Sequence, residues 1–320
     1  MALRDDNILR LSDGRRLGYA EYGDAGGDPI FIFHGNPGSR LSWGLLPGSS
    51  FRAGLRVIAP DRPGYGLSDF QPGRTFVDWP DDVVSLANAL GLNRFAVVGV
   101  SGGGPYALAC AWKIPERLTA VGVISAVGPL DAPRATEGMS RTNRLIFFLA
   151  RHAPRLTRRN MKYLGPLVHR SPEKLIKRLI FDAMADVDKA VVVRREIREL
   201  FRRDFQEAFR QGGCGSVHDL TLYARPWPIP LEQISMEVHL WQGEADPSVP
   251  PTMGYYLARA MPNCRATFIP NAGHLWIIDH VNEVLATLVP QKRPEGRRDL
   301  TFHSLTRLAK RPASPPFPPP

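Results

Sequence analysis

The chain has 320 residues, of which 43% are hydrophobic, enough for a full core, and this composition excludes a disordered protein. No apolar run approaches the roughly 18 residues that span a membrane, and three scattered cysteines are too few for a disulfide framework or a zinc site. The net charge of +10 lies mainly in residues 131–231 (+9) and 291–320 (+5). A solvated helical face is the commonest explanation, with anionic substrates, membrane surfaces and nucleic acid as alternatives.

In chain order, the first 124 residues alternate between apolar strands and amphipathic helices. A hairpin turning on Asp13-Gly14 comes first. Strands are then expected over residues 29–33, 55–59, 95–98 and 118–124, and helices near Trp43, over 81–90 and over 106–112. This rhythm predicts an α/β fold with a mostly parallel sheet and helices on both faces.

The alternation stops at about residue 128, and the chain is helical and basic as far as residue 231. Over 188–211, apolar residues recur at helix spacing and include Phe201, Phe205 and Phe209. The strand pattern resumes over 236–241 and 266–269, and a last helix is expected over 281–288. Residues 291–320 are rich in proline, and we expect a disordered tail of polyproline II character. A proline-rich docking ligand is the alternative for this tail.

A nucleophile elbow is indicated where the strand ending at Val98 meets the next helix. The sequence Gly99-Val100-Ser101-Gly102-Gly103 places a serine on a tight turn, with glycines where strand and helix approach closely. An ordinary glycine turn or a phosphate-binding loop would be the alternative, but neither glycine-rich phosphate motif is present. Ser101 is therefore the candidate nucleophile.

A serine hydroxyl needs a base, and the base needs a group that fixes its tautomer. Asp246 follows the strand over 236–241, and His274 follows the strand over 266–269. The order Ser, Asp, His is the one expected for this elbow, and both side chains should reach the same sheet edge as Ser101. Glu244 and Asp131 compete with Asp246 for the role of the acid.

The reaction also needs donors for the developing oxyanion. One is expected to be the backbone N–H of Gly102, directly after the nucleophile. The second should come from the loop that begins at His34, where Pro37 has no N–H and Asn36 is our choice. His34 is expected to brace this loop by hydrogen bonds.

With these residues in place, the chain resembles the α/β-hydrolase superfamily in its alpha/beta hydrolase fold-1 branch over about residues 12–290. Four ordered blocks carry the resemblance: His34-Gly-Asn-Pro-Gly, Asp61-Arg-Pro-Gly-Tyr-Gly-Leu-Ser, Gly99-Val-Ser-Gly-Gly, and Asp246 with Asn271-Ala-Gly-His274. Residues 213–231 also resemble the return from lid to core in many uncharacterised bacterial members. The resemblance implies an eight-stranded sheet in a core of residues 1–127 and 232–290, with a helical lid over 128–231 inserted after the sixth strand.

These observations predict a serine hydrolase that acts on an ester, or less favourably an amide, of a small molecule, with no metal or organic cofactor. Phe201, Phe205 and Phe209 are expected to line an acyl or alkyl pocket. The family also includes haloalkane dehalogenases and epoxide hydrolases, which carry an aspartate where Ser101 stands. Proline iminopeptidases resemble the His34 block but usually have tryptophan where Gly102 stands. Cofactor-free haloperoxidase-like and acyltransferase activities would use the same triad, and a non-catalytic binding protein is the remaining alternative.

The N-terminus carries Arg4, Asp5 and Asp6 where a signal peptide would be apolar, so a cytoplasmic protein is expected. No nucleic-acid motif accompanies the arginines, and no stable membrane insertion is expected. Peripheral contact with a membrane stays open, because residues 141–162 mix apolar and basic residues; a lid helix pair packed on the core is the favoured interpretation. The oligomeric state is not predicted.

Overall fold

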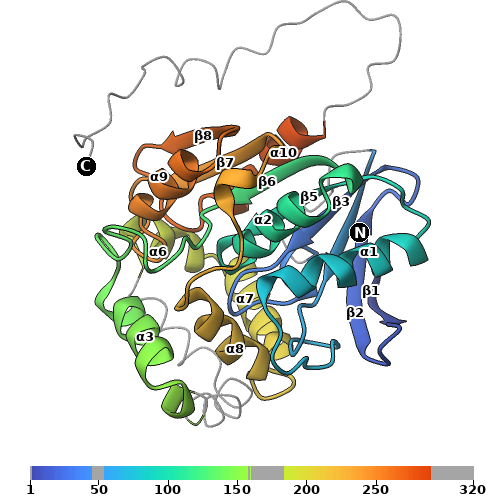
Figure 1. The fold of residues 1–320 in the computed structure, drawn as a ribbon, viewed down its shortest axis with the longest axis horizontal. Helices are drawn as coiled ribbons and strands as arrows, with labels where there is room; N and C mark the ends of the chain where they lie inside the picture. Colours follow the sequence, from blue (N-terminus) through green and yellow to red (C-terminus); the bar gives the residue numbers. More distant parts are fainter. Residues whose placement is uncertain (1, 45–53, 158, 160–183, 290–320) are drawn as a thin grey trace, which may run out of the picture. The chain divides into compact units, whose positions relative to one another are not determined.

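The computed structural model describes residues 2–44, 54–157, 159 and 184–289. Within them, eight strands form one sheet in the order β1-β2-β4-β3-β5-β6-β7-β8 (Figure 1). Their bounds are β1 Ala2–Arg10, β2 Arg16–Gly23, β3 Asp28–Phe33, β4 Leu55–Pro60, β5 Phe95–Val100, β6 Leu118–Ile124, β7 Val238–Gly243 and β8 Cys264–Ile269. The β1–β2 and β2–β4 pairs are antiparallel, and all pairs from β4 to β8 are parallel. The predicted eight-stranded, mostly parallel sheet is confirmed.

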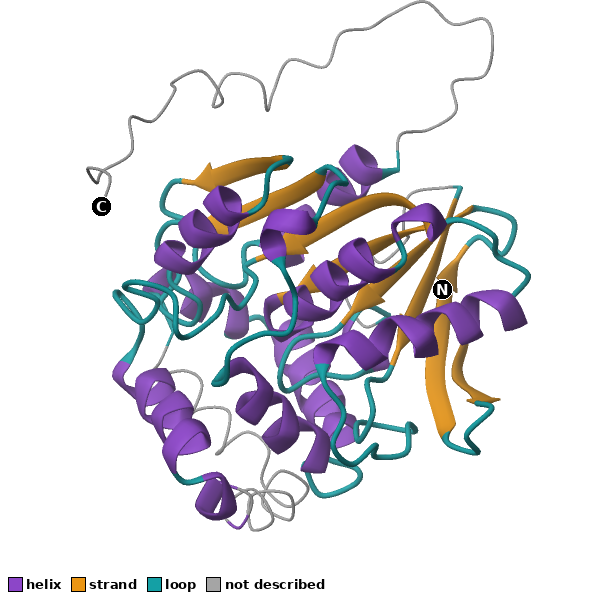
Figure 2. Cartoon of the chain, viewed as in Figure 1, coloured by secondary structure: helices purple, strands orange, loops and turns teal. Residues whose placement is uncertain are grey.

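Helices cover both faces of this sheet (Figure 2). Successive residues of β3 point to opposite faces, so Phe31 and Phe33 join one apolar cluster while Ile30 and Ile32 join the other. The first cluster includes side chains of α1 (Trp79–Ala89), α2 (Gly104–Lys113) and α9 (Pro251–Ala260), and the second includes those of α10 (Ile277–Leu288). Each of these β3 side chains is at most 1% exposed, and its burial contributes about 1.5–3 kcal/mol. The core therefore fixes the sheet that carries the site.

Between β6 and β7 the chain leaves the sheet and forms helices α3 (Arg141–His152), α6 (Asp186–Val192), α7 (Arg195–Ala208) and α8 (Cys214–Tyr223). Figure 1 shows them together beside the sheet, in green to yellow. No helix within the described ranges has the length and hydrophobicity needed to cross a bilayer. Two predicted segments, residues 290–320 and part of the predicted lid (158 and 160–183), lie outside the described residues.

The single helix predicted over 188–211 was wrong, because the structure has two helices there, α6 and α7. Arg194 has an extended backbone (ψ 131°) between α6 and α7, and its guanidinium pairs with Asp279 of α10 at 2.8 Å. Val193, one of the apolar residues at helix spacing in this segment, is consequently 58% exposed. Just before Trp43 the chain forms a short 3-10 helix, η1 (Arg40–Ser42); the helix predicted to contain Trp43 and Leu45 extends into residues 45–53, which lie outside the described residues. Strand β7 begins two residues later than predicted. Local apolar spacing could not reveal the kink, because its partner lies 85 residues away.

Candidate active site

The turn after β5 holds Ser101 in a conformation that side chains rarely adopt, with φ +53°. A Cβ at Gly99 would lie 2.3 Å from the carbonyl oxygen of Gly103, and a Cβ at Gly103 would lie 2.3 Å from the carbonyl oxygen of Phe33. Both positions therefore require glycine. The short 3-10 helix η3 (Ser101–Gly103) then leads directly into α2. The strained turn predicted from the sequence is present, and strain of this kind is concentrated at functional sites.

The structure brings Ser101, His274 and Asp246 into one chain of hydrogen bonds. His274 Nε2 lies 3.0 Å from Ser101 Oγ, and His274 Nδ1 lies 2.6 Å from Asp246 Oδ2. The other Asp246 oxygen accepts the backbone N–H groups of Ser248 and Val249 at 2.8 and 3.0 Å. A carboxylate at Nδ1 assigns the proton to that nitrogen and leaves the Nε2 lone pair facing Ser101. The arrangement can remove a proton from the serine hydroxyl.

The two competing acids lie elsewhere. Glu244 accepts a hydrogen bond from Tyr255 at 3.2 Å, and both Glu244 and Asp131 are exposed. Asp246 is 2% exposed and alone of the three acids contacts His274 among the described residues. The topology explains this, because Asp246 and His274 follow the adjacent strands β7 and β8.

Electrostatics at His274 favour the protonated imidazole. Burial by itself lowers its pKa, but the charge and hydrogen bond of Asp246, together with the charge of Asp188, raise the pKa above the ordinary 6.5. The raised pKa makes this imidazole a stronger proton acceptor.

Asp188, on α6, is a contact that the sequence did not predict. Its Oδ2 accepts the backbone N–H of His274, and its Oδ1 accepts that of Leu275, both at 2.8 Å. A Cβ at Gly273 would lie 2.3 Å from Asp188 Oδ1, so glycine is needed for this approach. Burial raises the pKa of Asp188, and the two N–H donors oppose that rise. In the sequence, an acidic residue in the first turn of a helix indicates only a favourable interaction with the helix dipole.

The loop after β3 lies against the elbow. A Cβ at Gly35 would lie 3.5 Å from Ser101 Cβ, and a Cβ at Gly102 would lie 2.9 Å from Asn36 Cβ. The two predicted oxyanion donors, Asn36 and Gly102, are therefore neighbours beside Ser101.

His34 braces this loop. Its Nε2 lies 3.1 Å from the backbone N–H of Arg62, which can only donate. Nδ1 must then carry the proton, which it donates to the carbonyl of Gly35 at 2.8 Å. Burial, and next the Arg62 charge, hold the pKa of His34 well below 6.5, so this imidazole is neutral.

Comparison with known proteins agrees with this geometry. The family model described as alpha/beta hydrolase fold matches residues 28–281. The chain belongs to the α/β-hydrolase fold family. It is 27% identical to a 2-hydroxymuconate semialdehyde hydrolase of Pseudomonas putida, over 87% of this chain and 91% of that protein. It is 37% identical to a non-heme chloroperoxidase of Streptomyces lividans over 125 residues, which cover 38% of this chain and 45% of that protein.

Among solved structures, this α/β-hydrolase resembles a thermophilic esterase from Thermogutta terrifontis. The TM-score is 0.61 at 24% identity, covering 88% of this chain and 97% of the esterase. At this identity the likeness shows the fold alone.

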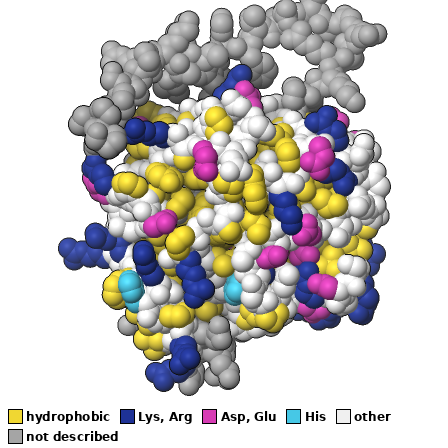
Figure 3. All heavy atoms as spheres, in the orientation of Figure 1, with side chains coloured by type: hydrophobic (Ala, Val, Ile, Leu, Met, Phe, Trp, Pro, Cys, Tyr) yellow, Lys and Arg dark blue, Asp and Glu magenta, His cyan; other side chains and the backbone are white. Residues whose placement is uncertain are grey.

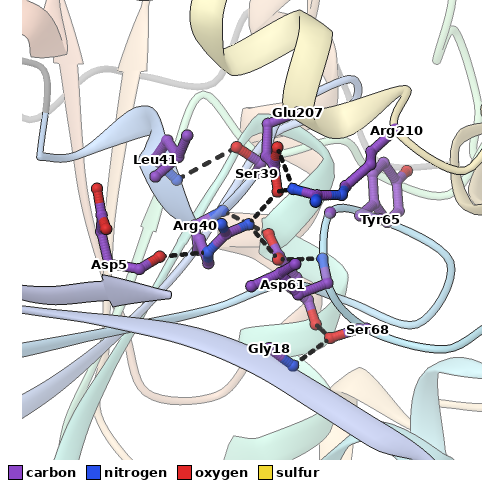
Figure 4. A network of polar contacts seen from close by, with 12 residues as sticks. Asp5, Gly18, Ser39, Arg40, Leu41, Asp61, Tyr65, Ser68, Glu207 and Arg210 are labelled. Atoms are coloured by element: carbon purple, nitrogen blue, oxygen red, sulfur yellow. Dashed lines mark hydrogen bonds and ion pairs between the residues drawn. The ribbon is translucent and has the colours of Figure 1, made fainter. Parts of the chain in front are cut away.

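The α/β-hydrolase core is joined to α7 by a buried polar network (Figure 4). Arg40 donates from its backbone N–H and from Nη1 to Asp61, at 2.7 and 2.9 Å, and from Nη1 to Glu207 of α7. Ser39 donates from its backbone N–H and hydroxyl to Asp204 of α7, at 2.9 and 2.6 Å. Two carboxylates one turn apart therefore attach α7 to the segment that follows the Asn36 loop.

The aromatic side chains of α7 contribute to the same attachment. Phe205 and Phe209 are 7% and 5% exposed and pack with Tyr65 of the core, while Phe201 is half-buried against the same group. A Cβ at Gly213 would lie 2.7 Å from the Phe209 ring. The structure thus gives Phe205 and Phe209 a packing role, and their predicted contact with a substrate stays a prediction.

Proposed function

We propose that this α/β-hydrolase is a serine hydrolase that cleaves carboxylic esters of small molecules through an acyl-enzyme on Ser101. The observation that carries the proposal is the hydrogen-bonded chain from Ser101 through His274 to Asp246, with Ser101 at a strained φ of +53°. The relative from Pseudomonas putida is named a hydrolase, which supports hydrolysis as the reaction class.

In the proposed reaction, Ser101 Oγ attacks the ester carbonyl carbon while its proton moves to His274 Nε2. The carbonyl oxygen becomes an oxyanion that accepts hydrogen bonds from the backbone N–H groups of Gly102 and Asn36. The tetrahedral intermediate expels the alcohol, which takes its proton from His274, and leaves the acyl group on Ser101. Water then attacks the acyl carbon while its proton moves to His274 Nε2. The second tetrahedral intermediate collapses, the bond to Ser101 Oγ breaks and the carboxylic acid leaves, and His274 returns the proton to Ser101. Asp246 keeps the imidazole in the required tautomer throughout.

The experiment is a panel of p-nitrophenyl esters and aminoacyl-p-nitroanilides, assayed with the wild type and Ser101→Ala. Ser125→Ala is the matched control, because Ser125 directly follows the neighbouring strand β6, is fully buried and also has a positive φ (+44°). We expect ester turnover that survives in the control and is lost in Ser101→Ala. Undiminished turnover in Ser101→Ala would overturn the proposal.

The same panel separates the alternatives. Selective cleavage of proline anilides would indicate an iminopeptidase. The tryptophan that iminopeptidases usually carry at the position of Gly102 would not fit in this chain, because even a Cβ there would lie 2.4 Å from Tyr223 Oη. An acyltransferase would form the same acyl-enzyme and pass the acyl group to an added alcohol faster than to water. Haloperoxidase-like activity would appear as peroxide-dependent halogenation.

We also propose that residues 128–231 form a lid whose side chains, Phe201 foremost, select the acyl group. Phe201 is half-buried between two apolar clusters, whereas Phe205 and Phe209 are already packed. Phe201→Ala should change the preference for acyl chain length, and an unchanged preference would contradict the assignment.

A cytoplasmic location is a further proposal. Cys110, Cys214 and Cys264 are all free thiols, as in proteins of a reducing compartment. Recovery of the native protein outside the cytoplasm in cell fractionation would overturn it.

A further inference from the structure

Asp219 on α8 lies at the centre of a cluster of buried charges and hydroxyls. It is fully buried, and so are Arg62 and Tyr65. The groups that donate to its carboxylate are Arg62 Nη2 at 2.9 Å, Tyr65 Oη at 2.8 Å, Arg74 Nη2 and Tyr106 Oη. Burial raises the pKa of Asp219, but the charges of Arg74 and Arg62 outweigh it and hold the pKa far below the ordinary 3.8. Asp219 is therefore an anion that fixes two cations behind the Asn36 loop.

The cluster reaches the first proposed oxyanion donor through Arg62. Its guanidinium donates to the carbonyls of His34 and Gly35, the latter at 3.1 Å, and His34 Nδ1 donates to the same Gly35 oxygen. The Gly35–Asn36 peptide is trans, so its N–H points opposite to its C=O. Fixing the Gly35 carbonyl consequently fixes the direction of the Asn36 N–H. A cation at the oxygen also polarises the peptide and makes the N–H a better donor.

Helix α8 contacts the two residues that carry the proposed donors, at the Gly102 carbonyl and at the Asn36 side chain. Tyr223 Oη donates to the carbonyl of Gly102 at 2.8 Å. Ser216 and Asn36 form a reciprocal pair of hydrogen bonds. Ser216 Oγ donates to Asn36 Oδ1 at 2.6 Å, and Asn36 Nδ2 donates to the Ser216 carbonyl at 3.2 Å. Positions 216, 219 and 223 recur every three or four residues and therefore share one face of the helix.

We propose that α8 holds the oxyanion hole in shape, with Ser216, Asp219 and Tyr223 as positioning residues. The inference rests on the proposed function. It gives one helix of the proposed lid a part in the chemistry, because its contacts hold the Gly102 carbonyl and the Asn36 side chain next to the two donors.

The test compares Tyr223→Phe with Tyr22→Phe. Both tyrosines are buried, and each donates to a backbone carbonyl: Tyr223 to that of Gly102 at 2.8 Å, and Tyr22 to that of Arg40 at 3.0 Å. Losing one oxyanion donor outright costs about 100- to 1,000-fold in kcat. For the misplacement caused by Tyr223→Phe we expect a loss of kcat of about tenfold or more with KM within about twofold. Tyr22→Phe should keep kcat within about threefold.

An oxyanion-specific readout separates positioning from stability. An alkyl boronic acid binds serine hydrolases as a tetrahedral anion, so its inhibition constant should weaken in Tyr223→Phe by the same factor as kcat/KM. Ser216→Ala should act in the same direction. Asp219→Asn is a poor first choice, because it leaves two buried arginines without a counter-charge and could fail to fold.

The outcomes are distinguishable. If Ser101→Ala is inactive and Tyr223→Phe matches Tyr22→Phe in kcat and boronate inhibition, the inference is wrong while the proposed function stands. If Ser101→Ala retains ester turnover, the proposed function itself has failed.

A separate observation concerns the outer face of α3. Its inner side packs on the molecule, with Ala150 1% exposed and the Phe147 ring 6.5 Å from that of Tyr223. The outer side of α3 and the turn after it exposes apolar side chains: Leu145 (58%), Phe148 (58%) and Leu156 (38%). Interleaved with them are exposed arginines at 141, 144, 151 and 155. Within α3, which ends at His152, the spacing places Leu145 and Phe148 on one face with Arg141, Arg144 and Arg151; Arg155 and Leu156 lie just beyond the end of the helix.

The charge on this face is of one sign. The sequence contains no acidic residue between Glu137 and Glu173. Within the described part of the chain, the four arginines form no ion pair. In Figure 3, basic and apolar side chains occupy the lower left of the molecule, where Figure 1 places α3, without acidic ones among them. A bilayer with anionic headgroups complements both features, because arginines meet the phosphates while leucine and phenylalanine enter the acyl boundary.

We infer that the outer face of α3, defined by Leu145, Phe148, Leu156 and the four arginines, docks on anionic lipid bilayers. The test is sedimentation of the full chain with phosphatidylcholine vesicles that contain or lack phosphatidylglycerol, at low and high salt. Binding should require phosphatidylglycerol, weaken with salt, and fall about fivefold for each arginine removed in Arg144→Gln and Arg151→Gln. Phe148→Ser should also weaken it.

Two control variants carry matched changes elsewhere: Ile8→Ser at an apolar residue 50% exposed on β1, and Arg259→Gln on α9. Absence of binding, binding insensitive to salt, or equal losses in the controls would overturn the inference. A Phe148-dependent dimer in size-exclusion chromatography without vesicle binding would likewise overturn it and assign the face to a second copy of the chain.

Discussion

Replacing Asp204 with asparagine should stabilise the protein at neutral and alkaline pH, because this buried carboxylate forms no ion pair among the residues that the structure describes. Asp204 is 3% exposed, and its recorded hydrogen bonds come from Ser39 and Ser42. Burial raises its pKa to about 7 from the ordinary 3.8; the serine donors oppose the rise, and the charge of Asp61 adds to it. Within the described residues, Asp204 forms no ion pair.

The sign follows from proton linkage. The folded state binds the Asp204 proton more tightly than the unfolded state, so the stabilisation present below pH 3.8 is lost as pH rises through about 7. A difference of about 3 pKa units corresponds to about 4 kcal/mol of unfolding free energy. Asparagine has no charge to desolvate at any pH. Its Nδ2 can donate to Ser42 Oγ, which can turn its own proton to the Ser39 carbonyl 2.9 Å away.

The assay is urea unfolding of the wild type and Asp204→Asn from about pH 5 to about pH 8.5, with Asp131→Asn as the exposed control from the same segment. We expect the advantage of Asp204→Asn to grow by about 3 kcal/mol across this range, because about two pKa units separate pH 5 from the folded-state pKa of about 7, and the control to follow the wild type. Parallel pH curves for the wild type and Asp204→Asn would refute the reasoning.

Three further predictions concern the site and the attachment of α7. The acidic limb of the pH profile of kcat/KM for ester cleavage should have its midpoint above pH 6.5, because the pKa of His274 is raised. Asp188→Asn should move that midpoint to lower pH, because the charge of Asp188 contributes to the raised pKa; an unmoved midpoint would contradict the role of Asp188. Gly102→Ala should lower kcat by about 100-fold or more, because its Cβ would lie 2.4 Å from Tyr223 Oη. The control Gly26→Ala, whose Cβ would meet only an ordinary contact at 3.7 Å, should leave kcat unchanged. Steady-state kinetics should show that adding Tyr223→Phe to Gly102→Ala restores part of the loss. Arg40→Ala should cost about 3–5 kcal/mol in urea unfolding, because it leaves Asp61 buried without a counter-charge. Arg210→Ala, which removes an exposed partner of Glu207, should cost less than about 1 kcal/mol; equal costs would contradict this account of the network.

The sheet was predictable because its strands are continuous apolar runs, such as residues 29–33, bounded by glycine and proline. The same regularity located the turns where Ser101, Asp246 and His274 stand, since parallel strands end at one edge. Strand order still left Glu244 and Asp131 as rival acids, and it is the structure that places Asp246, His274 and Ser101 within hydrogen-bond reach of one another.

The contacts between the helices and the site were not predictable. Asp188 lies 86 residues from His274, and Ser216 lies 180 residues from Asn36, so no local pattern links them. In the sequence, polar residues at helix spacing in a basic segment indicate a solvated helix face, and Asp204 and Glu207 fit that pattern. In the structure, Ser39 and Arg40 instead donate hydrogen bonds to these two carboxylates. Helix faces show their partners only once the tertiary packing is known.

The central claim is a covalent acyl group on Ser101. Intact-mass and peptide-mapping mass spectrometry, after rapid acid quench of the protein with an activated ester, measures it directly. The account predicts one acyl adduct per chain on the peptide that contains Ser101, formed and lost at rates that match turnover, and absent from Ser101→Ala. Ester turnover with no adduct, or with the adduct on another residue, would contradict it.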